Sequence, residues 1–241
     1  MKNIPLVNFL IIDIETVSEK NNFESLTPEW QQLWEEKNIR SLPENITIAD
    51  YYGQRAAVMA EFAKVVCISI GYFRKEKEEY QFRVKSLFGH DEKALLKDFI
   101  ETVNQLEAVN KNWCFTGHNI KEFDIPFLCR RLLINSLNIP AYLDFQNMKP
   151  WETNMVDTFQ YWRFGDYKNF TSLKLLAAAL NVPSPKDDID GSMVGNVYWQ
   201  ENDLKRIAIY CQKDVVTVAN IVRKLKDLPL LTEDQIVFVS S

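Results

Sequence analysis

Acidic side chains stand at three places in the sequence where their neighbours point to chemistry. Asp13 and Glu15 are two residues apart and directly follow the apolar run Phe9–Ile12. Residues two apart on a strand project from the same face, so both carboxylates are expected on one side of a sheet. Carboxylates held side by side raise each other's pKa unless a divalent cation neutralises them. The pair therefore predicts a metal site, with simple capping of the next turn as the alternative.

Two later segments place acids in similarly informative surroundings. Asp124 follows a short predicted strand and stands at the start of a predicted helix, where it could cap that helix or reach a metal ion. Asn119 and Phe123 precede it, and an amide beside a ring could hold a sugar and its base. Tyr210 and Asp214 are four residues apart on a predicted helix, so phenol and carboxylate share one face. Apolar residues surround Asp214, and a charge in such surroundings needs a compensating partner.

Hydrophobic periodicity defines the elements that must position these residues. Short apolar or alternating runs predict strands, and apolar residues at helical spacing predict helices. The predicted strands are Phe9–Ile12, Val65–Phe73, Tyr80–Lys85, Trp113–Thr116 and Met155–Thr158. The predicted helices cover about 91–106, 124–137, 172–180 and 203–226, and a helical insertion occupies about 27–62 after the first strand. This order indicates an α/β fold, a mixed five-stranded sheet flanked by helices, in a single domain over residues 1–241.

Composition narrows the class of protein further. The 241 residues include 28 basic and 33 acidic side chains, a net charge of −5, so no global cationic field attracts nucleic acid or an anionic membrane. Nucleic-acid binding would have to come from local contacts. The cysteines are widely separated among apolar neighbours, which predicts reduced core residues and excludes a disulfide scaffold or a zinc site; they are Cys67, Cys114, Cys129 and Cys211. No apolar window is long enough for a bilayer span, so we expect no membrane partner and a cytoplasmic location.

Together, the three acidic segments resemble the motifs of the DEDD superfamily of 3′–5′ exonucleases, which have a ribonuclease H-like (DnaQ-like) fold. The similar segments are Asp13-x-Glu15-Thr16, Asn119 through Leu128, and Tyr210-x-x-x-Asp214. A tyrosine four residues before the last acid resembles the DEDDy subclass, whereas the DEDDh subclass has a histidine where this chain has Ile209. Within DEDDy, the chain is most similar to the proofreading domain of family B DNA polymerases and to stand-alone bacterial proteins related to it. For the latter group, Lys186–Val194 is a further similarity.

The resemblance implies an enzyme that hydrolyses phosphodiester bonds at the 3′ end of single-stranded nucleic acid, DNA in preference to RNA, with two Mg²⁺ or Mn²⁺ ions. It implies that Tyr210 orients the attacking water. It also implies that backbone groups of Ile14 and Thr16, with the side chains of Asn119 and Phe123, contact the terminal nucleotide. The metal ligands that it implies are Asp13, Glu15, Asp124 and Asp214.

Three alternatives remain at this point. The substrate could be RNA, because the contacts to a 2′-hydroxyl cannot be recognised in the sequence. The fold could carry an inactive module that only binds nucleic acid or a partner. A metal-dependent phosphatase on an unrelated fold would leave the ordered third motif unexplained. The sequence assigns no role to the insertion at about 27–62.

Overall fold

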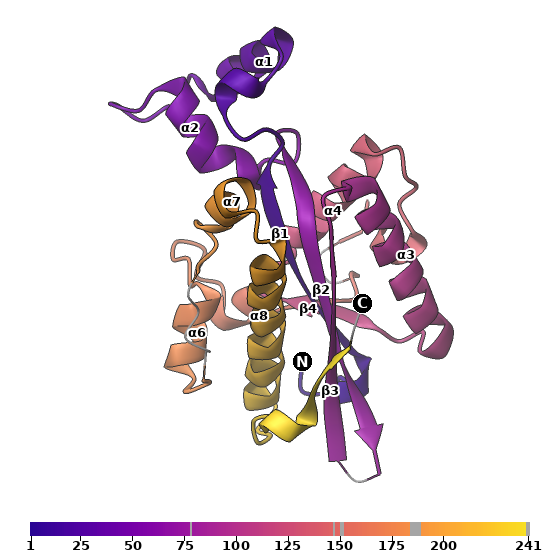
Figure 1. Cartoon of the computed structure of the whole chain (residues 1–241). Helices are drawn as coiled ribbons and strands as arrows, with labels where there is room; N and C mark the ends of the chain where they lie inside the picture. Colours follow the sequence, from indigo (N-terminus) through magenta and orange to yellow (C-terminus); the bar gives the residue numbers. More distant parts are fainter. Residues whose placement is uncertain (78, 147, 150–151, 184–188, 240–241) are drawn as a thin grey trace.

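A six-stranded mixed sheet forms the centre of the computed structural model, which describes residues 1–77, 79–146, 148–149, 152–183 and 189–239 (Figure 1). The strand order is β5-β4-β1-β2-β3-β6. The strands are β1 Phe9–Ser18, β2 Ala63–Glu76, β3 Glu79–Phe88, β4 Cys114–Gly117, β5 Met155–Asp157 and β6 Ile236–Val239. The β1–β2 and β2–β3 pairs are antiparallel, and the other three pairs are parallel. The predicted mixed sheet is confirmed, but the predicted number of five strands was wrong, because β6 adds a sixth strand beside β3.

Helices cover both faces of this sheet (Figure 1). One face packs against α3 and α4, and α8 packs against the other with α6 beside it. The helices are α1 Pro28–Asn38, α2 Ile48–Arg55, α3 Glu92–Val109, α4 Asp124–Ile134, α5 Thr158–Arg163, α6 Leu173–Ala179, α7 Val194–Asn196 and α8 Leu204–Leu225. Short 3₁₀ turns lie at Leu6–Asn8, Phe23–Ser25, Ala56–Val58, Ala141–Leu143 and Glu233–Gln235, and a π-helical turn at Val197–Glu201. Within the described ranges, none of the helices combines the length and the apolar character that crossing a bilayer requires.

The alternation of side chains along β1 explains where its two acids point. Ile12 and Ile14 pack into the core under α3 and α4, whereas Ile11 packs into the core under α8. Asp13 and Glu15 continue the odd-numbered series, so they face the α8 side. The strand runs through both acids to Ser18, which corrects the prediction that they follow the strand.

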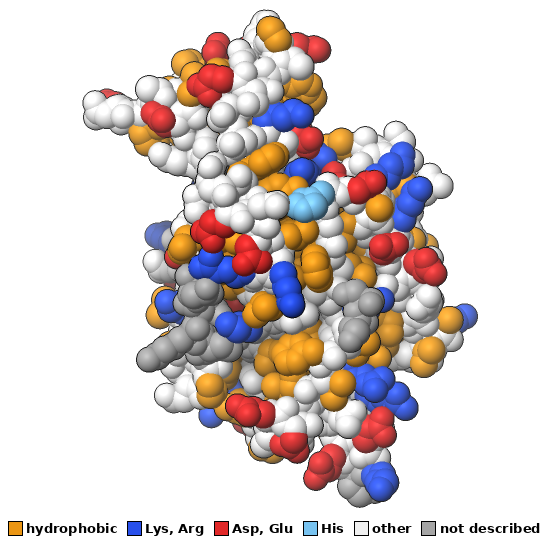
Figure 2. Space-filling model, in the orientation of Figure 1, with side chains coloured by type: hydrophobic (Ala, Val, Ile, Leu, Met, Phe, Trp, Pro, Cys, Tyr) orange, Lys and Arg blue, Asp and Glu red, His pale blue; other side chains and the backbone are white. Residues whose placement is uncertain are grey.

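The predicted helical insertion is confirmed between β1 and β2. It contains α1 and α2 and has its own apolar core, formed by Leu26, Trp34, Tyr52, Ala56 and Phe62. Figures 1 and 2 show it as a lobe that projects from the rest of the molecule beyond the end of the sheet. The lobe is also joined to the strand that carries the acids, since the Thr16 hydroxyl donates to the Ala57 carbonyl at 2.7 Å.

A buried ion pair fixes the base of the lobe against the sheet. The Arg131 guanidinium of α4 donates to both Glu92 carboxylate oxygens, at 2.8 and 2.5 Å, and to the Ala60 carbonyl at 2.8 Å. Glu92 also accepts the Val65 amide of β2 at 2.7 Å. Because both charges are buried and paired bidentately, this contact holds α3, α4 and the end of the insertion in one arrangement.

Candidate active site

The second half of β1 has an open edge, and the first and second acidic segments meet there. β4 pairs with β1 only from Phe9 to Ile11, so the amides further along need other partners. The Ile14 amide donates to Asp124 Oδ1 at 3.2 Å. Asp124 is 4% exposed and is the first residue of α4, whose N-cap is Phe123. Its carboxylate therefore reaches β1. Asp124 is not the N-cap of α4, so the helix-capping alternative was wrong.

A glycine lets the chain pass this close to β1. Gly117 ends β4, and a Cβ there would lie 2.0 Å from Ile120 Cγ2 and 2.8 Å from the Ile12 carbonyl oxygen. Backbone so close to its neighbour leaves no space for a side chain. The turn from β4 into α4 thus depends on Gly117 to bring Asp124 to the open edge.

Helix α8 brings the third segment to the same place. The Cys211 thiol donates to Asp13 Oδ2 at 3.2 Å, and its sulfur is 3.4 Å from the Asp13 carbonyl oxygen. Ligand atoms of Asp13, Glu15 and Cys211 all lie within 4.8 Å of one another. Asp214 is close enough that its charge raises the pKa of Asp13, Glu15 and Tyr210.

Electrostatics at this cluster strongly favour a cation. Burial raises the pKa of Asp13 and of Glu15 well above its usual range, and the neighbouring acids raise both further. Burial also raises the pKa of Asp124 to about 7, although hydrogen bonds from backbone amides oppose the shift. Among the described lysines and arginines, none forms an ion pair with these three acids. The carboxylate oxygens could hold a hard divalent cation such as Mg²⁺ or Mn²⁺.

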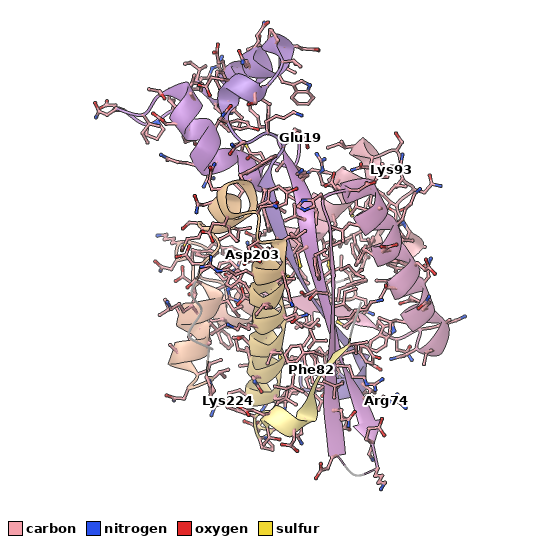
Figure 3. The ribbon with its side chains drawn as sticks, viewed as in Figure 1. Glu19, Arg74, Phe82, Lys93, Asp203 and Lys224 are labelled. Atoms are coloured by element: carbon pink, nitrogen blue, oxygen red, sulfur yellow. The ribbon has the colours of Figure 1, made fainter. Side chains whose placement is uncertain are left out.

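Tyr210 lies beside this cluster and also lines a hollow at the start of α8. Burial, and then the charges of Asp214 and Glu15, raise the pKa of its phenol, so the hydroxyl stays protonated at neutral pH. The hollow has a volume of about 290 Å³ and is lined by Asp203, Lys205, Arg206, Ile209, Tyr210 and Lys213. Lys205, Arg206 and Lys213 bring positive charge to this hollow, whereas Asp203, the N-cap of α8, brings negative charge (Figure 3), and Arg206 forms an ion pair with Glu201. The hollow therefore has a small excess of positive charge, which suits a phosphate group.

The residues expected to contact a nucleotide lie in the second half of β1 and in the turn between β4 and α4. Asn119 has a left-handed backbone with φ 66°, and its side-chain oxygen is buried without a hydrogen-bond partner among the described residues. The Phe123 ring is half-buried and packs against Phe127 with ring centroids 5.3 Å apart. The Ile14 amide donates to Asp124. The Thr16 hydroxyl donates to the Ala57 carbonyl of the insertion.

Sequence reasoning missed Asp157, which positions this edge. Its carboxylate is 3% exposed and accepts the amides of Asn119 and Lys121 at 2.9 and 3.1 Å. The same carboxylate accepts the first amides of α5, from Phe159 at 2.9 Å and Gln160 at 3.3 Å. An acid at the end of a predicted strand was the available signal, as at Asp13. Cys211 was also missed in this role, although its prediction as a reduced, buried cysteine is confirmed.

Over residues 57–222 the chain matches a family described as a predicted 3′–5′ exonuclease related to the exonuclease domain of PolB. The chain belongs to this PolB-like exonuclease family. The matched range includes the second and third acidic segments of the PolB-like chain, whereas Asp13 and Glu15 precede it. The segment Lys186–Val194 has a further similarity to stand-alone bacterial proteins. Residues 186–188 of this segment lie outside the described residues, and its Ile189 and Val194 are buried.

The fold of this PolB-like exonuclease family member agrees with a solved polymerase. The family B DNA polymerase from the hyperthermophilic archaeon Pyrobaculum calidifontis matches it with a TM-score of 0.56 and 15% sequence identity. The match covers 92% of this chain and 25% of the polymerase, so the chain spans about a quarter of that protein's length. The likeness confirms the α/β, ribonuclease H-like fold. None of the curated proteins matches the sequence.

Proposed function

We propose that this chain is a divalent-metal-dependent 3′–5′ exonuclease that acts on single-stranded nucleic acid, with DNA as its substrate. The observation that carries the proposal is the meeting of Asp13 and Glu15 of β1 with Tyr210 and Asp214 of α8. Membership of the PolB-like family supports the exonuclease activity and its direction.

The donor set fits hard divalent cations. Asp13 and Glu15 have ligand atoms within 4.8 Å of each other. Burial raises the pKa of both carboxyls, the neighbouring acids raise it further, and none of the described lysines and arginines forms an ion pair with them. Asp13, Glu15 and Asp214 would hold one ion, with Asp13 and Asp124 on a second. When bound, Mg²⁺ or Mn²⁺ would neutralise the scissile phosphate and make water a better nucleophile. The Cys211 thiol, whose pKa burial raises well above its usual value, would remain a donor that orients Asp13.

Tyr210 would orient the attacking water. A phenol with a raised pKa cannot take a proton at neutral pH, but its hydroxyl can donate one hydrogen bond and accept another. In the adjoining hollow, Lys205 would contribute positive charge for a contact with the phosphate backbone. Asn119 and Phe123 would hold the sugar and base of the terminal nucleotide. A base held in this way must leave its partner, which favours single strands over blunt duplex.

A nuclease assay on single-stranded oligonucleotides labelled at the 3′ or 5′ end tests the proposal. Wild-type protein with Mg²⁺ or Mn²⁺ should release mononucleotides stepwise from the 3′ end, and EDTA should stop the reaction. Asp13→Asn, which keeps the shape and removes the charge, should lower the rate by at least ~10³-fold. Asp98→Asn changes an exposed acid on α3, on the other face of the sheet, and serves as the matched control. Undiminished hydrolysis by Asp13→Asn would overturn the metal-site assignment.

The same assay separates the proposal from its alternatives. Matched RNA and DNA oligonucleotides compare the two substrates directly, and faster hydrolysis of RNA would make the chain an exoribonuclease. An inactive binding module would bind the oligonucleotide without hydrolysing it at millimolar Mn²⁺. Equal rates on single strands and blunt duplex would contradict the expected need to unpair the last base.

A further inference from the structure

The segment from α5 to the start of α6 exposes a cluster of aromatic rings. Phe164 is 85% exposed, Tyr167 78%, Phe170 67% and Tyr161 36%. The first three exceed every other aromatic side chain in the described part of the chain. We call these four residues the aromatic platform. Exposed apolar surface gathered in one segment commonly marks a binding site.

Helix α5 ends at Phe164 in a left-handed backbone conformation. Phe164 has φ 45° and ψ 37°, and Gly165 follows with φ 89°. A bulky residue is disfavoured in this left-handed region, and such strain persists where surrounding structure imposes it. The platform is anchored from below, because Phe170 packs on Phe159 with centroids 5.1 Å apart and Trp162 packs into the core between α6 and α8.

Cations alternate with these rings. The Arg163 guanidinium lies 4.3 Å from the centroid of the Tyr167 ring. Lys168 and Lys174 are exposed in the same segment, and its acidic residue is Asp166. Because Arg163 is paired with Glu122, the exposed Lys168 and Lys174 supply the positive charge that an anionic ligand would meet here, in a chain with a net charge of −5. Rings interleaved with cations match single-stranded nucleic acid, whose bases stack on aromatic side chains while cations contact its phosphates.

The platform is continuous with the candidate active site. Arg163 Nη1 forms an ion pair with Glu122 Oε1 at 3.2 Å, and Glu122 is adjacent to Phe123. Asp157 holds the Asn119 amide and also the first turn of α5, so one carboxylate fixes both regions. A strand whose terminal base lies at Asn119 and Phe123 would therefore meet the platform with its next nucleotides.

We propose that the aromatic platform binds single-stranded nucleic acid immediately 5′ of the nucleotide in the active site, by stacking of bases on Phe164 and Tyr167. The proposal rests on the proposed function, because that function places the 3′ end at the acidic cluster. Ring stacking tolerates any base, so the platform sets the length of strand that is bound and not its sequence.

Binding of oligothymidylates of different length tests this platform. Fluorescence anisotropy would give the Kd of a 3-mer and of a 12-mer, both with phosphorothioate linkages and in Ca²⁺ to prevent cleavage. The double variant Phe164→Leu/Tyr167→Leu keeps apolar area but removes two ring faces. The advantage of the 12-mer over the 3-mer should fall by about 10- to 100-fold in this variant. Tyr167→Phe, which keeps the ring, should retain the advantage.

Phe238→Leu is the matched control. Its ring is 56% exposed on β6, at the opposite edge of the sheet from β5 and the platform, and this variant should retain the full length dependence. Circular dichroism melts would confirm that each variant folds. An unchanged length dependence in the double variant would overturn the platform, and it would leave another partner, such as a protein, for these rings. Failure of the wild-type protein to hydrolyse any strand would instead overturn the proposed function, while loss of length dependence would still support the platform.

Discussion

At the scale of single side chains, Tyr210 could either orient the attacking water or bind a metal ion. Burial raises the pKa of its phenol, and the charges of the nearby Asp214 and Glu15 raise it further. The hydroxyl therefore keeps its proton throughout the neutral range, and it can orient water but cannot act as a base. An orienting role affects turnover, whereas a ligand role would affect metal affinity.

Tyr210→Phe should lower kcat by about 10²-fold, because one positioned hydrogen bond is lost at the reacting water. Calorimetric titration with Mn²⁺ should give the wild-type affinity, while Asp214→Ala should bind Mn²⁺ more weakly. Tyr142→Phe removes the hydroxyl of another half-buried tyrosine, away from the acidic cluster, and should leave kcat unchanged. If Tyr210→Phe weakened Mn²⁺ binding as much as Asp214→Ala does, the orienting role would be wrong.

At the scale of elements, Asp157 ties α5 to the loop that precedes α4. One carboxylate accepts four backbone amides, two from each element. Asp157→Ala should lower the free energy of unfolding by about 2–4 kcal/mol, since charged hydrogen bonds and a helix cap are lost together. It should also lower kcat/KM, measured well below the melting temperature, because Asn119 is no longer held.

A second N-cap aspartate gives the matched control for Asp157. Asp91 caps α3 on the other face of the sheet, and its carboxylate accepts the Ala94 amide at 3.1 Å. Asp91→Ala should cost about 1 kcal/mol in urea unfolding and leave kcat/KM unchanged. Equal loss of activity in both variants would show that general instability, and not the position of Asn119, causes the effect.

Elements with a strong hydrophobic period could be predicted from the sequence, and short ones that depend on tertiary contacts could not. The eighteen residues of α3 and the twenty-two of α8 carry clear apolar faces, and the predicted bounds differ from the observed ones by a few residues. The six residues of α5 are too few for a period, and its start depends on the Asp157 cap. The four residues of β6 form a strand only because β3 offers a free edge.

The identity and order of the candidate site residues could be predicted from the sequence, but their contacts could not. Alternation places Asp13 and Glu15 on one face whether the strand ends at Ile12 or continues, so the prediction of a shared face did not depend on the strand's end. The sequence could not show that the Cys211 thiol donates to Asp13, because the apolar periodicity of the helix does not indicate which group a thiol on its buried face contacts. The partner of Asp124, an amide 110 residues away, also follows only from the fold.

At the scale of the whole molecule, buried acids couple folding to pH and to metal. The pKa of Asp124 is about 7 in the folded chain, against an ordinary value of 3.8. The folded, metal-free state therefore holds a proton that the unfolded state releases near pH 4. The stability from this group is fully present below about pH 4 and is lost as pH rises through about 7. The raised pKa values of Asp13 and Glu15 act in the same direction, whereas the lowered pKa of His118 acts in the opposite one.

The metal-free protein should thus have a lower melting temperature at pH 8 than at pH 5. Mn²⁺ should raise the melting temperature at pH 8 and should hardly change it at pH 5. Protonated carboxyls do not bind the ion, whereas at pH 8 each bound cation offsets the repulsion among the acids and stabilises the folded state by mass action. Melting curves with EDTA or Mn²⁺ at both pH values measure this effect.

Asp124→Asn keeps an acceptor for the Ile14 amide without the charge, so it should flatten the pH dependence of the melting temperature. Asp98→Asn, on the exposed side of α3, should keep the wild-type slope. Equal stabilisation by Mn²⁺ at both pH values would contradict a site built from these buried carboxylates.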